Sequence, residues 1–379
     1  MAYTLGIDLD IDQVKLCLIH VEGPQKVPYV DWLIFRVPFH FGPDYYCEFG
    51  GALMETIAQF LYVKKIDPQQ LNKIYFLSGM PYSAFASFEE GLHYTANVFI
   101  QSLFDPEKVG ILRADGKPFT PREILASVKG ESASAFVATQ FYGSSYLASR
   151  MFKHAVVIDV GSRETHITPI LKARIDPEGR AKLGRYLRHR LSHHQFMPHG
   201  ALYTSVNQIR QSARLKDQEF PFTARVCRMV VIASLLKYIH PEIAREHDFP
   251  LLKESDAYVL LARAIGLDLK TISQKELHEL AQVIYTDFCD YLGDSLQAVL
   301  KAQGRQSEQL QLVSSGVAGK HVMEHAFRRN QLVKERFVHF ADKLPHRLHE
   351  ASNAYGIALY AMERLMDENF PPEKVEVLP

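Results

Sequence analysis

The sequence has little that would mark a membrane protein or a nucleic-acid-binding protein. Its 379 residues contain 43 Lys and Arg against 43 Asp and Glu, so the formal net charge is zero. Such a chain creates no long-range field that attracts nucleic acid or an anionic membrane. No apolar run approaches the ~18 residues that a membrane span needs, and Asp8 and Asp10 interrupt the first apolar run at once. We therefore expect a cytoplasmic protein with neither nucleic acid nor membrane among its partners.

Several chemistries lose support because their residues are missing. The four cysteines are scattered and none belongs to a Cys-x-x-Cys pair, so we expect thiols that are buried or inert. The sequence contains no Gly-x-Ser-x-Gly, Walker A or His-Glu-x-x-His pattern. These absences disfavour serine-esterase, P-loop and zinc-protease chemistry.

The order of β-type and helical segments indicates an internal duplication. Three β-type runs at 3–9, 14–19 and 30–37 precede alternating helical and buried β-type segments, and the pattern starts again at 154–159. A long Ala- and Ser-rich helix is expected at 131–152, and a basic strand near 182–190. At ~150 residues per domain, the chain accommodates two domains. The expected division is 1–150, then 151–370 with a helical insertion at about 200–305, and a flexible tail at 371–379.

The first candidate site is the turn between the first two β-type runs. The segment reads Gly6-Ile-Asp-Leu-Asp-Ile-Asp-Gln-Val-Lys15, so Asp8, Asp10 and Asp12 crowd its tip. Alternate residues of a strand share a face, which brings Asp8 and Asp10 together if the extended geometry persists. Two close carboxylates favour a divalent cation between them. The turn predicts a Mg²⁺ site that holds a di- or triphosphate, and the alternative is a solvated acidic turn.

Two later turns combine glycine with hydroxyl or basic residues. In Asp159-Val-Gly-Ser162, Gly161 lets a ligand approach the backbone, while Ser162 and Thr165 offer hydroxyls to phosphate oxygens. Gly316-Val-Ala-Gly319 follows the last buried β-type run and precedes a helix, which suits a phosphate or a ribose. Each turn alone is compatible with an ordinary tight turn. Three such turns in one duplicated chain favour a phosphate site.

Arginine and histidine are concentrated between residues 185 and 200. The cluster comprises Arg185, Arg188, His189, Arg190, His193, His194 and His199. One interpretation is a cationic wall for phosphate or carboxylate substrates. A metal site at His193 or His194 is a weaker alternative, because no acidic or cysteine ligand stands at suitable spacing beside them. A plain basic surface is the third.

In the residues of these three turns, the chain resembles the actin/Hsp70/sugar-kinase ATPase superfold, and within it the hydantoinase/oxoprolinase-like branch. The family's first turn, roughly Gly-Ile-Asp-Ile-Gly-Gly-x-x-x-Lys, is matched by Gly6, Ile7, Asp8 and Lys15. Its second turn, roughly Asp-x-Gly-Ser-Thr-Thr-Thr-Asp-Ile-x-Pro-Ile, is matched by Asp159, Gly161, Ser162, Thr165, Ile167, Pro169 and Ile170. Gly316 and the segment 351–356 resemble the third turn and the final helix. The most similar subfamily is that of tetrahydromethanopterin-linked C1 transfer pathway proteins, which includes a synthase of methanofuran biosynthesis.

The resemblance implies a fold and a set of site residues. The implied fold is α/β, with duplicated RNase H-like domains of the actin/Hsp70/sugar-kinase type, mixed sheets and an interdomain cleft. The implied catalytic residues are Asp8, Asp159 and Lys15, of which Asp8 and Asp159 would also hold Mg²⁺. The implied phosphate-binding residues are Asp10, Gly161, Ser162, Arg163, Thr165, His166, Gly316, Gly319 and Lys320.

The sequence departs from the family pattern at two of the three turns. Asp10 and Ile11 replace paired glycines at the first turn. Arg163, Glu164 and His166 replace two threonines and an aspartate at the second. Side chains thus occupy positions that a phosphate would approach.

Three functions remain open at this point. The first is a transferase of methanofuran- or methylofuran-type C1-carrier biosynthesis, which condenses a furanylmethyl diphosphate with a phenolic acceptor and releases pyrophosphate. The second is a non-catalytic paralogue that supports a catalytic homologue as a protein subunit. The third is an ATP-dependent kinase or amidohydrolase of the same superfold. The expected ligands are a small phosphorylated substrate with Mg²⁺, or ATP.

Overall fold

The computed structural model describes residues 1–369, except 11–12, 23–27, 37–45, 79–84, 138, 177, 180–182, 184, 216, 223–226, 240–242, 244–253, 305–308, 331–335 and 346. Asp12 and the expected tail at 371–379 lie outside these residues. The chain divides into two compact units. The first unit consists of Met1–Ala155, Thr168–Ser192 and Lys343–Pro379, and the second of Val156–Ile167 and His193–Asp342.

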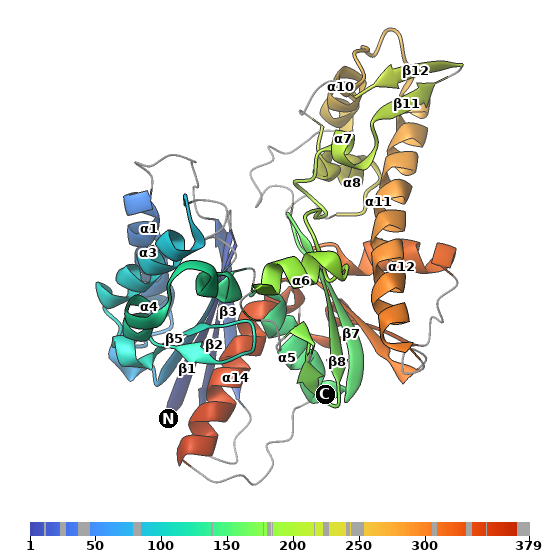
Figure 1. The fold of residues 1–379 in the computed structure, drawn as a ribbon. Helices are drawn as coiled ribbons and strands as arrows, with labels where there is room; N and C mark the ends of the chain where they lie inside the picture. Colours follow the sequence, from blue (N-terminus) through green and yellow to red (C-terminus); the bar gives the residue numbers. More distant parts are fainter. Residues whose placement is uncertain are drawn as a thin grey trace. The chain divides into compact units, whose positions relative to one another are not determined.

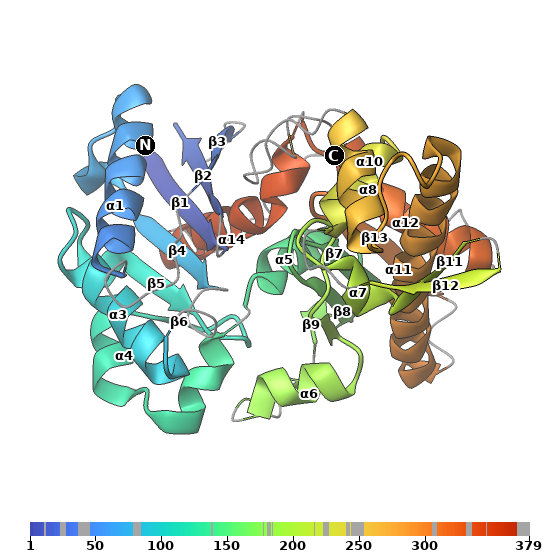
Figure 2. The same ribbon diagram turned by 90° about the horizontal axis from the view of Figure 1, so that it is seen from above.

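The first sheet, of which Figure 1 labels β1, β2, β3 and β5, has the strand order β3-β2-β1-β4-β5-β6, which can be followed in Figure 2. Its strands are β1 (Ala2–Leu9), β2 (Gln13–Val21), β3 (Tyr29–Arg36), β4 (Lys73–Ser78), β5 (Val109–Leu112) and β6 (Pro118–Phe119). β1 pairs antiparallel with β2 and parallel with β4, and β4 pairs parallel with β5. The accompanying helices are α1 (Tyr46–Val63), η2 (Pro68–Gln70), α3 (Phe88–Ile100), η3 (Pro106–Lys108), α4 (Pro121–Ser127), η4 (Gly130–Phe136) and α5 (Phe141–Met151).

The second sheet has the order β10-β8-β7-β13-β14, with β9 paired to β8. Its strands are β7 (His154–Val160), β8 (Thr165–Leu171), β9 (Arg174–Ile175), β10 (Phe196–Met197), β13 (Gln311–Ser315) and β14 (Phe337–His339). A separate hairpin joins β11 (Ser212–Leu215) and β12 (Gln218–Pro221). The remaining helices are α6 (Tyr186–Ser192), α7 (Val206–Ile209), α8 (Met229–Leu235), α10 (Glu254–Ala264), α11 (Gln274–Ala302), α12 (Gly319–Asn330), α13 (Phe340–Lys343), η8 (Leu348–Ala351) and α14 (Ser352–Asn369).

Both sheets have the same topology. When β6 and β9 are left aside and the remaining strands of each sheet are numbered in chain order, both sheets have the order 3-2-1-4-5. In both, a hairpin joins the first two strands, and helical segments separate the fourth strand from the earlier ones. The predicted duplication of an α/β unit is therefore confirmed.

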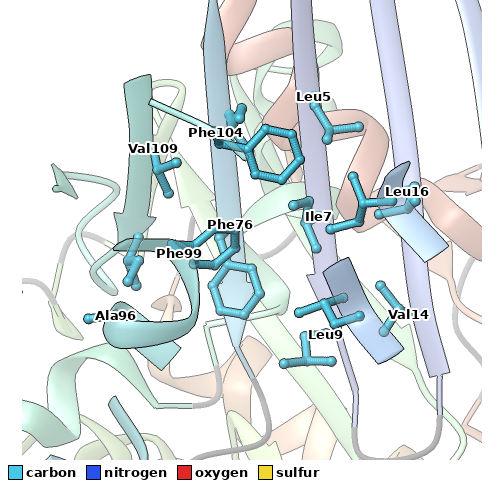
Figure 3. Packing of buried hydrophobic residues seen from close by; sticks show 14 of the residues in the cluster. Leu5, Ile7, Leu9, Val14, Leu16, Phe76, Ala96, Phe99, Phe104 and Val109 are labelled. Carbon is cyan, nitrogen blue, oxygen red and sulfur yellow. The ribbon is translucent and has the colours of Figure 1, made fainter. Parts of the chain in front are cut away.

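The two faces of strand β1 pack against different segments of the chain. Leu5, Ile7 and Leu9 point to one face, where they join a buried cluster that includes Phe76 and Phe99 (Figure 3). The hydrophobic alternation of the strand produces this face directly, because successive side chains point to opposite sides. Helix α1 contributes to the same cluster.

The opposite face of β1 is built for close approach of helix α14 (Figure 2). A Cβ atom at Gly6 would overlap the carbonyl oxygen of Ala354, and Thr4 Oγ1 donates a 2.9 Å hydrogen bond to the carbonyl of Ala358. Asp8 shares this face with Thr4 and Gly6 because it is the next alternate residue. Although α14 comes last in the sequence, it packs on the first sheet of the chain.

Two expected elements differ from the structure. The segment expected as one helix at 131–152 forms η4 and then α5, and Thr139, between them, accepts a 3.3 Å hydrogen bond from the backbone N–H of Ser78. This tertiary bond fixes the chain where a continuous helix would have passed. The expected close packing of the Ala- and Ser-rich part is confirmed, since a Cβ atom at Gly356 of α14 would overlap the carbonyl oxygen of Gly143.

The predicted basic strand near 182–190 is wrong, because residues 186–192 form helix α6. Helical spacing puts Tyr186 and Arg190 on one face, where both are buried beside Asp176. Alternation along a strand would have pointed these two side chains to one face as well, so the sequence pattern did not distinguish the two structures.

The cysteine and hydropathy expectations can be compared with the described residues. Cys17, Cys227 and Cys289 are buried, as predicted, and burial raises the pKa of Cys227 to about 12. The side chain of Cys47 lies outside the described residues. Within the part of the chain that the structure describes, no helix has the length and hydropathy to cross a bilayer.

Candidate phosphate-binding turns

The second predicted turn is a tight hairpin between β7 and β8. The backbone N–H of Gly161 donates a 2.9 Å hydrogen bond to the carbonyl of Glu164, which closes the turn. A Cβ atom at Gly161 would lie 2.9 Å from that same oxygen, so glycine allows the strands to close this tightly. Asp159 stands next to last in β7 and is 6% exposed. The predicted hairpin is present, and its carboxylate lies buried within β7.

The structure brings the third turn against the second within one unit. Ser315, the last residue of β13, donates a 2.7 Å hydrogen bond from Oγ to Asp159 Oδ1. Gly316 follows with a φ of +87°, a conformation that favours glycine. A Cβ atom there would overlap the carbonyl oxygen of Val160 and lie 2.9 Å from Asp159 Oδ1. Asp159, Ser315 and Gly316 therefore form one corner, which we call the Asp159 corner.

Helix α12 begins directly after the Asp159 corner. Its first residue is Gly319, whose N–H donates a 3.4 Å hydrogen bond back to the carbonyl of Gly316. Lys320 donates a 2.6 Å hydrogen bond to Asp342 Oδ1, and both side chains are exposed. The predicted contact of Lys320 with phosphate would thus require Lys320 to leave Asp342, and it stays a prediction.

At the second turn, the residues that depart from the family pattern contact each other or nearby aromatic rings. His166 Nε2 and Glu164 Oε1 form a 3.0 Å hydrogen bond, and the His166 ring lies 5.1 Å from that of Phe196. The Arg163 guanidinium lies 4.4 Å above the ring of Tyr203. These side chains have protein partners in the structure.

A segment that follows β10 covers the hairpin. The backbone N–H groups of Leu202 and Tyr203 donate hydrogen bonds of 3.0 and 2.9 Å to the carbonyl of Ser162. A Cβ atom at Gly200 would overlap the backbone of Arg163, and Thr165 Oγ1 donates 2.8 Å to the carbonyl of His199. The hairpin is therefore held from two sides, by this segment and by β13.

The first predicted turn lies in the other unit. Asp8 on β1 and Lys15 on β2 are direct cross-strand partners, and Lys15 Nζ lies 3.8 Å from Asp8 Oδ2. Both residues are buried. The N–H of Asp10 donates a 2.9 Å hydrogen bond to the carbonyl of Gln13, which closes the hairpin just beyond the end of β1. The predicted joint action of Asp8 and Asp159 on one ligand stays a prediction.

A metal ion at these turns would depend on few protein ligands. Among the described residues, no group of three or more His, Cys, Asp or Glu side chains could hold a metal ion. Mg²⁺ commonly binds through one or two carboxylates and takes its remaining ligands from water and substrate phosphates. The single carboxylate of the Asp159 corner fits that manner of binding.

Two residues that contact these turns, Ser315 and Tyr203, were not identified from the sequence. Ser315 stands directly before Gly316, and its hydroxyl beside a predicted glycine turn was the available signal. The stacking of Tyr203 on Arg163 had no local signal, because no sequence pattern links two positions that are 40 residues apart.

Comparisons with known proteins bear on the fold. A scan against protein-family models and a search of curated proteins both find no match. Among solved structures, the chain is similar to a nucleotide-free acetone carboxylase, with a TM-score of 0.52 and 10% identity over 94% of this chain and 70% of that chain. It is also similar to the ethanolamine utilization protein EutJ from Carboxydothermus hydrogenoformans, with a TM-score of 0.46 and 12% identity over 95% of this chain and 90% of that chain.

The repeated strand order and the similarity to acetone carboxylase indicate the same fold. The chain has an actin/Hsp70/sugar-kinase type of fold, built from duplicated RNase H-like α/β halves with mixed sheets. At 10% identity the likeness concerns the fold alone. In this actin-type fold, the hairpin between the first and second strands recurs in both halves, at Asp8–Lys15 in one and at Asp159–Thr165 in the other.

Proposed function

We propose that this chain binds a phosphate-bearing small molecule at the Asp159 corner. The observation that carries the proposal is the 2.7 Å hydrogen bond from Ser315 to Asp159, beside the positive-φ glycine at position 316. The bond orients a buried carboxylate, and the glycine lets the chain after β13 turn closely past Val160 and Asp159. Helix α12 begins at Gly319 and has 12 residues, so its first N–H groups and its dipole favour an anion nearby.

Each group of the Asp159 corner has a chemical task in this proposal. Asp159 would supply the carboxylate for Mg²⁺, and the ion would supply positive charge to the phosphate oxygens. Ser315 would keep the carboxylate in one orientation, which saves the cost of ordering it when ligand binds. Gly319 would let the phosphate approach the backbone at the first turn of α12.

We propose further that the ligand is a furanylmethyl diphosphate and that the protein acts in C1-carrier biosynthesis of the methanofuran or methylofuran type. The resemblance at Gly6–Lys15, Asp159–Ile170 and Gly316 supports this reaction class. In the reaction, a phenolic oxygen bonds to the methylene carbon, the carbon–oxygen bond to the diphosphate breaks, and pyrophosphate leaves. The phenolic proton passes to a carboxylate, for which Asp8 and Asp159 are the candidates. ATP is the alternative ligand, since the fold is similar to that of an enzyme of ATP-dependent acetone carboxylation.

The experiment is a thermal-shift titration of the full chain with Mg²⁺-pyrophosphate and, separately, with Mg²⁺-ATP. A ligand that binds only the native state stabilises it by about 2.7 kcal/mol at a hundred times its Kd. We expect stabilisation by Mg²⁺-pyrophosphate and loss of that response in Asp159→Asn, which keeps the shape and the acceptor for Ser315. Asp342→Asn is the matched control, because Asp342 is an exposed carboxylate of the same unit.

The outcomes separate the alternatives. A response to ATP but not to pyrophosphate would replace the transferase with an ATP-dependent enzyme. An equal response in wild type and Asp159→Asn would remove the Asp159 corner as the site.

A second candidate function is that of a non-catalytic subunit that supports a catalytic homologue. The Glu164–His166 hydrogen bond and the stacking of Arg163 on Tyr203 favour it, because the side chains at the altered positions of the second turn are engaged with the protein. Under this hypothesis neither ligand stabilises the chain, and a homologue with intact glycine turns co-purifies with it from the native cell. Assay of that complex with and without this chain measures the support.

A further inference from the structure

The first unit contains a cavity that shares no residue with the predicted phosphate turns. Its volume is about 650 Å³, within the range of about 300–1,000 Å³ typical of small-molecule sites. It lies among the beginning of α3, the 3₁₀ helix η4 and helix α6. All of its lining residues belong to the first unit.

The cavity has apolar walls on two sides. Phe88 is the first residue of α3 and Phe85 lies three residues before it, whereas Leu187 and Leu191 come from α6. The two leucines are four residues apart, so they lie on one face of the helix. Leu191 is 45% exposed, so it offers apolar surface that a ligand could cover.

Charged side chains also line the cavity. Arg185 and Arg188 are exposed, and neither forms an ion pair within the described residues. Glu89 is already engaged, because its carboxylate accepts a 2.6 Å hydrogen bond from the N–H of Gly130. Glu131 is exposed on η4 and is the remaining acidic group of the lining. The guanidinium groups of Arg185 and Arg188 are therefore the positively charged groups in this cavity that are available to bind an anion.

We propose that this cavity binds a small organic anion with an apolar body. The body would contact Phe85, Phe88 and Leu191, and the anionic end would bind Arg185 and Arg188. A guanidinium group offers paired N–H donors that match a carboxylate, sulfonate or phosphate. The site is independent of the Asp159 corner, so either proposal can fail while the other stands.

The test is a fluorescence titration of the full chain with anilinonaphthalene sulfonate, a dye with an aromatic body and one anionic group. We expect the double variant Arg185→Met/Arg188→Met to weaken dye binding about tenfold to a hundredfold, because hydrogen bonds to a charged group are lost. Glu131→Gln removes a repelling charge and is expected to tighten binding about twofold to fivefold. Arg263→Met, at an exposed arginine of α10, is the control and is expected to leave the Kd unchanged.

A competition experiment on the unmodified chain supplies a second readout. Phenylbutyrate is expected to displace the dye, whereas phenylbutyramide, which has the same body without the charge, is expected to displace it far less. Equal displacement by the two compounds overturns the proposal. So does an unchanged Kd in the double arginine variant, or weaker binding in Glu131→Gln.

Discussion

Replacement of either partner of the buried Asp176–Arg190 pair is expected to destabilise the first unit by about 3–5 kcal/mol, because the other charge is left buried without its counter-charge. Both side chains are 1% exposed, and Arg190 Nη1 lies 3.5 Å from Asp176 Oδ2. Tyr186 donates a 2.7 Å hydrogen bond to the same oxygen, and Arg190 Nη2 donates 3.0 Å to Thr168 Oγ1. The Arg190 guanidinium also lies 3.9 Å above the ring of Phe141.

The two single replacements differ in what they leave behind. Asp176→Asn keeps the size of the side chain but leaves the guanidinium uncompensated, so we expect a loss near the upper end of the range. Arg190→Met leaves a carboxylate that still accepts hydrogen bonds from Tyr186 and from the N–H of Gly179, so we expect a loss near the lower end. The double variant buries no charge, and we expect it to cost at least about 2 kcal/mol less than the sum of the two.

The assay is urea denaturation followed by tryptophan fluorescence. Trp32 is the only tryptophan of the chain and lies on β3, so its signal reports on the unit that contains the pair. Arg263→Met on α10 is the control for loss of an arginine from the surface, and we expect a change within about 0.5 kcal/mol. Additive effects of the two single replacements, or single losses below about 1 kcal/mol, would refute the reasoning.

Two further predictions concern packing and pH. Gly6→Ala is expected to destabilise the first unit by about 1–3 kcal/mol, because the new Cβ overlaps the backbone of Ala354. Gly51→Ala lies at a helical position with open space, so it is expected to stabilise the unit by about 0.5–1 kcal/mol. Urea denaturation followed by Trp32 fluorescence measures both changes, and equal effects would contradict the packing argument. Burial lowers the pKa of His339 below its ordinary value of about 6.5, although nearby Asp342 acts in the opposite direction. Protonation of His339 therefore favours the unfolded state, so this contribution to stability is present above about pH 6.5 and is lost as the pH falls towards the lowered pKa. His339→Gln is expected to flatten the fall in melting temperature between about pH 7 and pH 5, and an unchanged slope would contradict it.

Hydrophobic alternation and local turn chemistry predicted the first sheet well. The β-type runs expected at 3–9, 14–19 and 30–37 correspond to β1, β2 and β3, each to within a few residues. The hairpins after Asp8 and Asp159 were also predictable, because each combines β-type runs with a short polar turn. These features depend on residues close together in the sequence.

Features that depend on distant residues were not predictable in the same way. Nothing near Arg190 in the sequence distinguished a buried partner of Asp176 from a member of a cationic surface. Thr139 interrupts an otherwise helical pattern because it bonds to Ser78, which is 61 residues away in the sequence. Local periodicity carries no information about such bonds.

The sequence by itself determined the repeated α/β order, the positions of the three turns and the buried character of their strands, since these follow from side-chain alternation and turn residues within short windows. Only the tertiary structure decided that Ser315 and Gly316 meet Asp159, and that α14 packs on Gly6. Those contacts join segments more than 150 residues apart in the sequence. Their formation depends on strand order and on close backbone approach, which are properties of the folded chain.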